Sequence, residues 1–227
     1  MFQRIFDLLI LTVKDGDSLS YYPTTAGNVV LFLFIALLFV AMASFSGRKR
    51  TMKVKQLAFS AMAVTLAVVT SFIKFASLPF GGSITLFSMF FVCLIGYLYG
   101  TKAGVLTGIA YGILGLILQP YIYHPVQVLL DYPIAFGCLG LAGITANSKA
   151  GLIKGYAIGV FGRYLCHVVS GYIFFASFAP AGMNSMVYTL GYNATYILPE
   201  AIVTVLILLI PPVQNALKQV KRMAAEE

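Results

Sequence analysis

The sequence predicts an all-α integral membrane protein, and three observations support this fold class. Sixty per cent of the 227 residues are apolar and 10% are charged, whereas a soluble domain carries about 25% charged residues. Apolar runs long enough to cross the hydrocarbon core as helices, which takes about 20 residues, recur along the chain. The Lys and Arg residues gather between these runs in alternate loops. This spacing indicates membrane topology, and not a nucleic-acid surface, as the origin of the net charge of +8.

The apolar runs predict seven membrane-spanning helices, near residues 27–46, 55–78, 83–99, 103–119, 125–146, 155–178 and 185–211. Residues 47–55 carry five positive charges, and further Lys and Arg residues follow the third, fifth and seventh runs. Because Lys and Arg accumulate in cytoplasmic loops, we expect a multi-pass protein with its N-terminus outside and its C-terminus in the cytoplasm.

Three segments are predicted along the chain. Residues 1–50 comprise an interfacial helix within 1–26 and the first span, residues 51–213 form a six-helix membrane core, and residues 214–227 form a cytoplasmic tail. The N-terminal segment is poorly arranged for a cleaved signal peptide. Cys93, Cys138 and Cys166 lie far apart inside apolar runs, without metal or redox spacing, so we expect them to pack as small residues.

The motifs that the sequence lacks limit its chemistry. It contains no GxxxxGK[ST] loop for a nucleotide, no HExxH pair for zinc and no GxSxG nucleophile turn. We therefore expect a protein that is not an enzyme and has no metal or cofactor of its own. Energy for moving a solute would have to come from another subunit or from an ion gradient.

Few polar residues lie at membrane depth, and these are the candidates for function. They are Asp131 in the fifth span, Arg163 and His167 in the sixth, and Asn193 and Glu200 in the seventh. An ionisable group in hydrocarbon costs at least about 2.5–3.5 kcal/mol, so it normally faces a cavity or a partner. Gln127 stands four residues before Asp131, on the same face of its helix.

Two further stripes have the same helical spacing. Arg163, His167 and Gly171 form one, and the glycine leaves room beside the imidazole. Tyr188, Tyr192 and Tyr196 form the other, on the last span. Together with Asp131 they predict an outward-opening pocket for a flat, cationic, hydrogen-bonding ligand. Aromatic rings bind such a ligand by stacking and cation–π attraction, and the acid supplies charge and directional hydrogen bonds.

Each of these residues also has a purely structural interpretation. Asp131 could form a buried salt bridge with Arg163, and Glu200 could play a structural role against the same guanidinium. His167 could simply pack within the bundle. The tyrosines could belong to the aromatic belt found at membrane interfaces.

Five segments between about residues 54 and 212 stand out, in this order: LPFGGSITLFSMFFV, YGTKAGVLTGIAYGIL, HPVQVLLDYPIAF, GRYLCHVVSGYIFFASFAPAGM and VYTLGYNATYILPE. Together, and in the same order, they resemble the thiamine-specific S components (ThiT or YuaJ family) of energy-coupling factor (ECF) vitamin transporters. The resemblance implies high-affinity binding of thiamine near the outer face of a bacterial cell membrane, by a six-span core to which the first span here is an addition. It also implies a transmembrane coupling subunit and two ATPase subunits as partners, so that ATP is used only by the partners.

The resemblance carries ten substrate-binding residues onto this sequence. The acid that contacts thiamine corresponds to Asp131, one methylene shorter than the Glu of some relatives, and the imidazole against the ligand rings corresponds to His167. The other eight positions are Tyr132, Gly171, Arg163, Phe175, Tyr188, Asn193, Tyr121 and Tyr111. Relatives can stack thiamine on tryptophans, whereas this chain has none. Phe175 stands at one such position and Gly81–Gly82 near another, so we expect weaker cation–π attraction.

The resemblance also places the face used against the coupling subunit on the first core helix. Small side chains allow close approach of helices in a membrane. Here the small residues assigned to this face are Ala58, Ala63 and Ala67, with Met62 interrupting the stripe.

Three other functions are possible for such a sequence. The nearest is an S component for another vitamin or for hydroxymethylpyrimidine, a thiamine precursor. An ion-coupled secondary transporter with Asp131 or Glu200 cycling protons is disfavoured, because paired broken helices and an inverted repeat are missing. A membrane enzyme with His167 and Asp131 as acid and base lacks a nucleophile or metal set.

Overall fold

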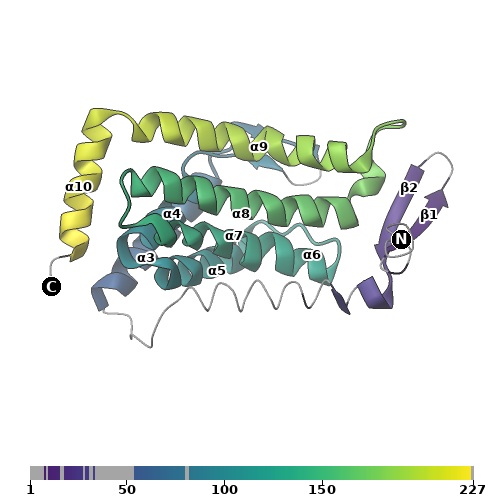
Figure 1. The fold of residues 1–227 in the computed structure, drawn as a ribbon, viewed down its shortest axis with the longest axis horizontal. Coiled ribbons are helices and arrows are strands. Elements are labelled where there is room, and N and C mark those ends of the chain that lie inside the picture. The colour runs from purple at the N-terminus through teal and green to yellow at the C-terminus, as the bar shows by residue number, and fades with distance from the viewer. Residues whose placement is uncertain are drawn as a thin grey trace.

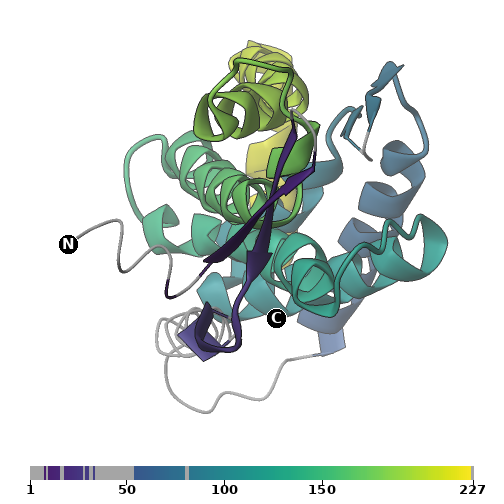
Figure 2. The same cartoon turned by 90° about the vertical axis from the view of Figure 1, so that its right-hand side faces the viewer.

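The computed structural model describes residues 8, 10–15, 18–27, 29–30, 33, 54–79 and 82–225. In this part the chain forms a bundle of long helices, seen from the side in Figure 1 and end-on in Figure 2. The helices are α3 (Val54–Ser71), α4 (Ser88–Tyr99), α5 (Thr101–Leu118), a helix over 125–145, α8 (Gly151–Phe174) and α9 (Ser185–Leu208). Five of them are long and apolar enough to span a membrane, and α4 is a shorter apolar helix. The predicted all-α membrane fold is confirmed.

The N-terminal segment differs from its prediction. Strands β1 (Ile10–Asp15) and β2 (Ser18–Pro23) form an antiparallel hairpin at one end of the bundle (Figure 1). The interfacial helix expected within 1–26 is therefore wrong over these residues. Asp15 pairs with Ser18, and the two residues between them in the sequence, Gly and Asp, are typical of a tight hairpin turn. Most of the extra span expected at 27–46 lies outside the described residues, so that span stays a prediction.

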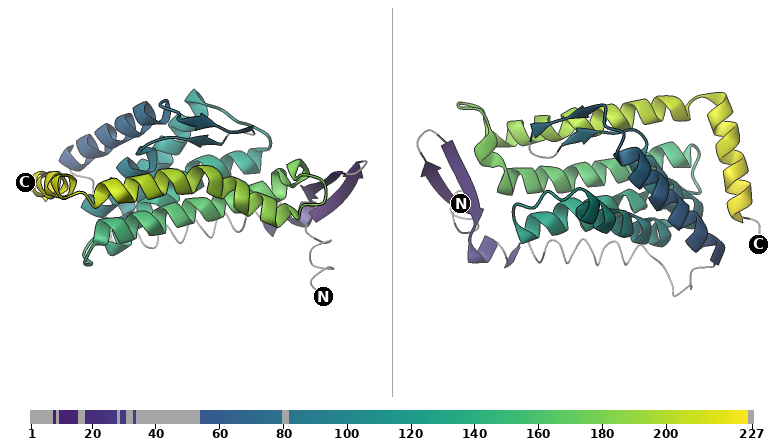
Figure 3. Two further views of the ribbon diagram at one scale, coloured as in Figure 1. Left: turned by 90° about the horizontal axis from the view of Figure 1, so that it is seen from above. Right: turned by 180° about the vertical axis from the view of Figure 1, so that it is seen from behind.

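The first two core helices are shorter than their apolar runs. α3 ends at Ser71 and not near residue 78, and α4 begins at Ser88 and not at 83. Between them, β3 (Ala76–Ser77) pairs with β4 (Ser83–Ile84), and this small hairpin lies beside α9 (Figure 3). Lys74 and Pro79 disfavour a continuing helix in lipid, although the average hydropathy stays high. Lys74 thus belongs to the connecting segment and not to a span.

The helix that carries Asp131 changes its winding along its length. It consists of α6 (Pro125–Leu129), a π-helical turn η2 (Leu130–Ile134), α7 (Ala135–Cys138) and a 3-10 stretch η3 (Leu139–Thr145). Pro133 lies inside the π turn and has no N–H to donate to the regular α-helical ladder. Single π turns inside α-helices occur frequently at functional sites, and here the turn contains the one acid of this helix.

Glycines let α5 pack against this helix at backbone distance. α5 has glycine at every fourth position, namely Gly104, Gly108 and Gly112. A Cβ on Gly108 would lie 2.2 Å from the carbonyl oxygen of Phe136, and one on Gly140 would lie 2.0 Å from the backbone nitrogen of Val105. Small residues at helix contacts allow this approach in membrane bundles. The acid-bearing helix is thereby held directly against α5.

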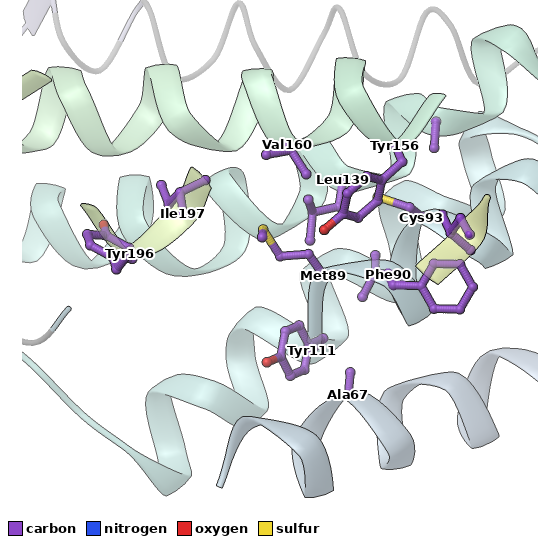
Figure 4. Packing of buried hydrophobic residues seen from close by; sticks show 13 residues of the cluster. Ala67, Met89, Phe90, Cys93, Tyr111, Leu139, Tyr156, Val160, Tyr196 and Ile197 are labelled. Carbon is purple, nitrogen blue, oxygen red and sulfur yellow. The ribbon is translucent and has the colours of Figure 1, made fainter. Parts of the chain in front are cut away.

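The main core lies between α4, η3 and α8. Met89, Cys93, Leu139 and Tyr156 are fully buried there and pack against one another (Figure 4). In a second cluster the Sγ atoms of Cys138 and Cys166 approach to 3.8 Å, and all three cysteines are free and buried. The expectation that the cysteines pack as small residues is confirmed.

The chain after α9 turns across the end of the bundle opposite the N-terminal hairpin (Figure 1). Helix α10 (Pro211–Ala225) occupies this position, so the expected tail is helical as far as Ala225. Val213 and Leu217 pack against the main core. Lys221 Nζ donates a hydrogen bond to Tyr97 Oη at 3.1 Å and lies over the same ring. The last segment is thus attached to the bundle.

Candidate functional site

A cavity of about 180 Å³ lies among α5, the 125–145 helix, α8, α9 and the β3–β4 segment. All ten residues assigned to substrate binding line it. They are Tyr111, Tyr121, Asp131, Tyr132, Arg163, His167, Gly171, Phe175, Tyr188 and Asn193. The structure therefore brings together residues separated by more than 80 positions in the sequence. Their role in binding stays a prediction.

The cavity has further lining residues that were not assigned to substrate binding. Gln127, Tyr192 and Tyr196 belong to the polar stripes noted in the sequence. Gln119, Phe136 and Thr189 also line the cavity, and their sequence context resembles that of any residue packed in a helix. Only the folded arrangement identifies these three.

Asp131 presents a carboxylate oxygen that lacks a hydrogen bond. Its Oδ2 accepts a hydrogen bond from Gln127 Nε2 at 2.7 Å. Its Oδ1 lies 3.2 Å from His167 Nδ1, close enough for electrostatic attraction. That contact is not aligned as a hydrogen bond, so Oδ1 is buried with the imidazole nitrogen as its neighbour and accepts no hydrogen bond. A ligand that donates to this carboxylate would add a charge-assisted hydrogen bond.

His167 lies between the acid and Arg163. Arg163 Nε donates a hydrogen bond to His167 Nε2 at 3.3 Å, and the guanidinium carbon lies 4.4 Å from the centre of the Phe136 ring. Because Nε2 accepts, a neutral imidazole carries its proton on Nδ1, which faces Asp131. The direct salt bridge between Asp131 and Arg163 considered from the sequence is therefore not the observed arrangement.

Glu200 belongs to a different polar cluster, which caps α4. The side chain is 3% exposed. Its carboxylate accepts hydrogen bonds from Thr85 Oγ1 at 2.7 Å, Ser88 Oγ at 2.9 Å and Met89 N at 3.1 Å. The first N–H groups of a helix have no partner within the helix, so this carboxylate supplies one. The structural interpretation of Glu200 is correct, but its suggested partner, Arg163, is wrong.

Aromatic rings surround the polar part of the cavity. The Phe175 ring centre lies 5.9 Å from that of Tyr121 and 5.3 Å from that of Tyr123. On α9, the ring centres of Tyr188 and Tyr192 lie 5.9 Å apart. Burial raises the pKa of the Tyr121 hydroxyl above its ordinary value, so this hydroxyl stays protonated at neutral pH and can donate a hydrogen bond. These rings offer stacking surfaces to a flat ligand.

Gly171 allows α9 to approach α8 beside His167. A Cβ at this position would lie 2.7 Å from Thr189 Cγ2 and 3.2 Å from Asn193 Nδ2. The Asn193 amide nitrogen donates to the backbone oxygens of His167 at 3.3 Å and Thr189 at 2.9 Å, and its Oδ1 accepts from Tyr196 Oη at 2.6 Å. Both amide hydrogens are thus used by the protein, and the Asn193 oxygen keeps one further lone pair.

Tyr192 attaches the β3–β4 segment to α9. Its hydroxyl donates a hydrogen bond to the backbone oxygen of Pro79 and accepts one from Gly82 N at 3.2 Å. A Cβ on Gly82 would lie 2.9 Å from both the Tyr192 hydroxyl and the Tyr196 ring. Glycine at 82 therefore lets the segment lie directly on these tyrosines. Gly81, the other half of the predicted pair, lies outside the described residues.

Two of the three alanines assigned to a partner interface point into the bundle. Ala63 and Ala67 are 5% and 0% exposed and belong to hydrophobic clusters. Their assignment to a partner surface is wrong, because residues buried in the bundle cannot contact another subunit. Ala58 is exposed, and Ala61 and Thr65 are exposed small residues on the same helix.

Comparisons with known proteins agree with this architecture. A family model described as thiamine transporter protein (Thia_YuaJ) matches residues 57–220. The thiamine transporter ThiT of Bacillus subtilis (strain 168) is 39% identical over 163 residues, which are 66% of this chain and 83% of that protein. ThiT of Lacticaseibacillus paracasei is 34% identical over 117 residues, which are 44% of this chain and 58% of that protein.

The fold is also similar to that of a solved structure, ThiT from Listeria monocytogenes. The match has a TM-score of 0.62 and covers 74% of this chain and 96% of that chain. Sequence identity between the two is 23%, so this comparison concerns the fold alone.

Proposed function

The chain belongs to the thiamine transporter protein family (Thia_YuaJ), and from this premise we propose that it is the thiamine-binding S component of an ATP-driven ECF uptake transporter. In this role it captures the vitamin in the cavity. The energy for transport comes from ATP hydrolysis in separate partner subunits, reached through a transmembrane coupling subunit.

The observation that carries this proposal is the Asp131 carboxylate in an aromatic cavity, where Oδ1 lies 3.2 Å from His167 Nδ1 but accepts no hydrogen bond. Thiamine combines a flat aminopyrimidine, whose amine donates hydrogen bonds, with a positively charged thiazolium ring. The carboxylate supplies an acceptor for the amine and a counter-charge for the thiazolium, and charge-assisted hydrogen bonds are the stronger kind. Tyr121, Phe175 and Tyr188 supply rings for stacking and cation–π attraction.

We propose that the cavity opens to the outside of the cell. It lies at the end of the bundle formed by the segments 72–87, 119–124 and 175–184, which together contain one Lys, Lys74, and no Arg. The opposite end carries Lys102, Lys149, Lys154 and the basic residues of α10. Positive residues favour the cytoplasmic side of a membrane, which supports a cytoplasmic C-terminus.

Purified protein is expected to bind thiamine tightly with 1:1 stoichiometry in isothermal titration calorimetry. Thiamine phosphates, hydroxymethylpyrimidine and riboflavin serve as competitors that vary charge, size and ring system. Hydroxymethylpyrimidine lacks the thiazolium and is expected to bind more weakly, because its binding gains no charge attraction. Riboflavin binding without thiamine binding would contradict the proposal.

Transport separates the S component from a self-sufficient carrier. The chain alone in proteoliposomes is expected to bind labelled thiamine without accumulating it. Accumulation is expected only when an ECF coupling subunit and its ATPases are reconstituted with it and ATP is supplied. Uncoupler-sensitive uptake by the chain alone, indifferent to ATP, would instead identify an ion-coupled secondary transporter.

We place the contact with the coupling subunit on the exposed face of α3. Ala58 and Ala61 are the small residues on this face, and close helix approach requires small side chains. The double substitution Ala58→Leu/Ala61→Leu is expected to lower ATP-driven uptake at least roughly tenfold, since one added side chain at a tight contact costs about 1–3 kcal/mol. Thiamine binding by the isolated protein is expected to stay unchanged.

Ala157→Leu is the matched control, because Ala157 is an exposed alanine on α8. It is expected to keep uptake near the unsubstituted level. Equal loss of uptake in both variants, or full uptake in the α3 variant, would place the coupling face elsewhere.

A further inference from the structure

We propose that Gln127 is a positioning residue for Asp131. The backbone of the mouth segment 121–124 fixes the orientation of the Gln127 amide, so that its NH₂ group points at the carboxylate. The amide holds Oδ2 of the acid as a hydrogen-bond acceptor, so that the acid meets the ligand as a carboxylate with Oδ1 available. This inference rests on the proposed function, because it concerns how the same cavity selects a cationic vitamin.

Gln127 connects the acid to the backbone of the cavity mouth. The side chain is 1% exposed. Its Oε1 accepts hydrogen bonds from the backbone nitrogens of Tyr123 at 3.1 Å and His124 at 3.5 Å. Its Nε2 donates to the backbone oxygen of Tyr121 at 3.2 Å and to Asp131 Oδ2 at 2.7 Å. Every hydrogen and both lone pairs of this amide are therefore in use.

These partners allow one orientation of the amide. If the Gln127 amide were rotated by 180°, its NH₂ group would face two backbone N–H groups. Its oxygen would then face the Tyr121 carbonyl and the carboxylate. Backbone N–H and C=O groups cannot exchange roles, so all four hydrogen bonds would be lost. The fold of the mouth segment thus determines that a donor points at Asp131.

The mouth segment is itself fixed to the same helix. His124 is the N-cap residue of α6, and its Nδ1 accepts a hydrogen bond from Val126 N at 3.2 Å. Gln127 completes this capping box by accepting from the backbone nitrogen of His124. A reciprocal box of this kind satisfies helix-end donors and fixes the entry of the chain. The His124 ring also stacks on Phe174 at 4.9 Å between ring centres, which ties the segment to α8.

A hydrogen bond donated to a carboxylate favours its ionised form. The other titratable or charged groups that act on Asp131 come from three helices: Arg163, Cys166 and His167 of α8, Tyr196 of α9, and Tyr132 of its own helix. His167 Nδ1 lies 3.2 Å from Oδ1. Gln127 is the group that holds Oδ2, so its removal is expected to make protonation of the acid easier.

The test measures thiamine affinity by calorimetry at several pH values between about pH 5 and about pH 8. Gln127→Leu removes the donor at similar side-chain size. At neutral pH its affinity is expected to fall roughly 10- to 100-fold, the range for a lost hydrogen bond to a charged group. The fall in affinity on the acid side is expected to move to higher pH, because a hydrogen bond donated to a carboxylate favours its ionised form.

Gln119→Leu is the matched control. Gln119 lines the same cavity, but its Nε2 donates to Ser71 Oγ at 3.2 Å and not to the acid. Whatever its effect on affinity, this variant is expected to keep the pH profile of the unsubstituted protein. His167 is present in all these variants, so it does not by itself produce a difference between their profiles.

Gln127→Glu provides a second variant should Gln127→Leu fail to fold, as judged by size-exclusion chromatography and thermal unfolding. It keeps the acceptor for Tyr123 N but places a carboxylate against Asp131, so the two acids would share a proton. The acid-side fall in affinity is again expected at higher pH.

The outcomes separate the two proposals. An unchanged pH profile in the folded Gln127 variants, while the unsubstituted protein binds thiamine, overturns the role of Gln127 and leaves the proposed function standing. A purely structural role would lower affinity or stability without moving the profile. Absence of thiamine binding by the unsubstituted protein at every pH overturns both.

Discussion

Asp131→Asn is expected to lower the affinity for thiamine roughly 100- to 1000-fold, which corresponds to about 3–4 kcal/mol. The substitution keeps the size of the side chain but removes the negative charge that opposes the thiazolium. It also puts an NH₂ group either against Gln127 Nε2, a donor at 2.7 Å, or at Oδ1, where the ligand is expected to donate. Truncating one member of a buried, hydrogen-bonded charge pair typically costs about 2–5 kcal/mol. Calorimetric titration of the purified variant measures the loss.

Two further variants test whether the loss of affinity comes from the negative charge at position 131. Asp131→Glu keeps the negative charge on a side chain one methylene longer and is expected to retain most of the affinity. Glu200→Gln makes the same chemical change at the other membrane-embedded acid, whose carboxylate caps α4. We expect it to lower the unfolding temperature while changing affinity less than roughly tenfold, since the lost interaction is a hydrogen bond within the protein. Near-native affinity in Asp131→Asn would contradict the role assigned to the acid.

Gly140→Ala is expected to destabilise the bundle by about 3 kcal/mol or more, the upper end of overpacking effects. The new Cβ would lie 2.0 Å from Val105 N and 2.2 Å from Gly104 C, both backbone atoms of α5. Backbone cannot move aside as a flexible side chain can, so the 125–145 helix would have to separate from α5. Thermal unfolding in detergent, followed by circular dichroism, measures the effect. Thiamine affinity is expected to fall as well, because this helix carries Asp131.

Gly191→Ala is the control for the added methyl group. Gly191 lies within α9, and a Cβ there would meet nothing within 4 Å. Alanine favours the helix over glycine by about 1 kcal/mol, so this variant is expected to unfold at the same or a slightly higher temperature. Equal unfolding temperatures for Gly140→Ala and the unsubstituted protein would show that the helices are not in backbone contact.

The sequence alone determined the membrane class and the candidate residues of the cavity. Hydropathy and Lys/Arg placement locate the six core helices, because about 20 apolar residues are needed to cross a bilayer. Helical spacing correctly joined Gln127 with Asp131, and Arg163 with His167. These polar groups were visible because an ionisable side chain in lipid is costly and therefore needs a reason to be there. The resemblance to a known family added rings such as Tyr111 and Phe175, which spacing alone does not single out.

Only the tertiary structure decided which way the apolar faces turn and which polar groups meet. In water, one polar face of a helix shows which side is exposed. In a membrane the lipid is as apolar as the protein interior, so the sequence of α3 does not reveal that Ala63 and Ala67 point inward and Ala58 outward. The partners of Glu200, more than 100 residues away, depend on how the chain folds back on itself, and the hydrogen bonds of Gln127 depend on the local turn of the mouth segment. Hydropathy does not predict such directional contacts, because it averages the polarity of side chains and contains no information on the direction of their hydrogen bonds.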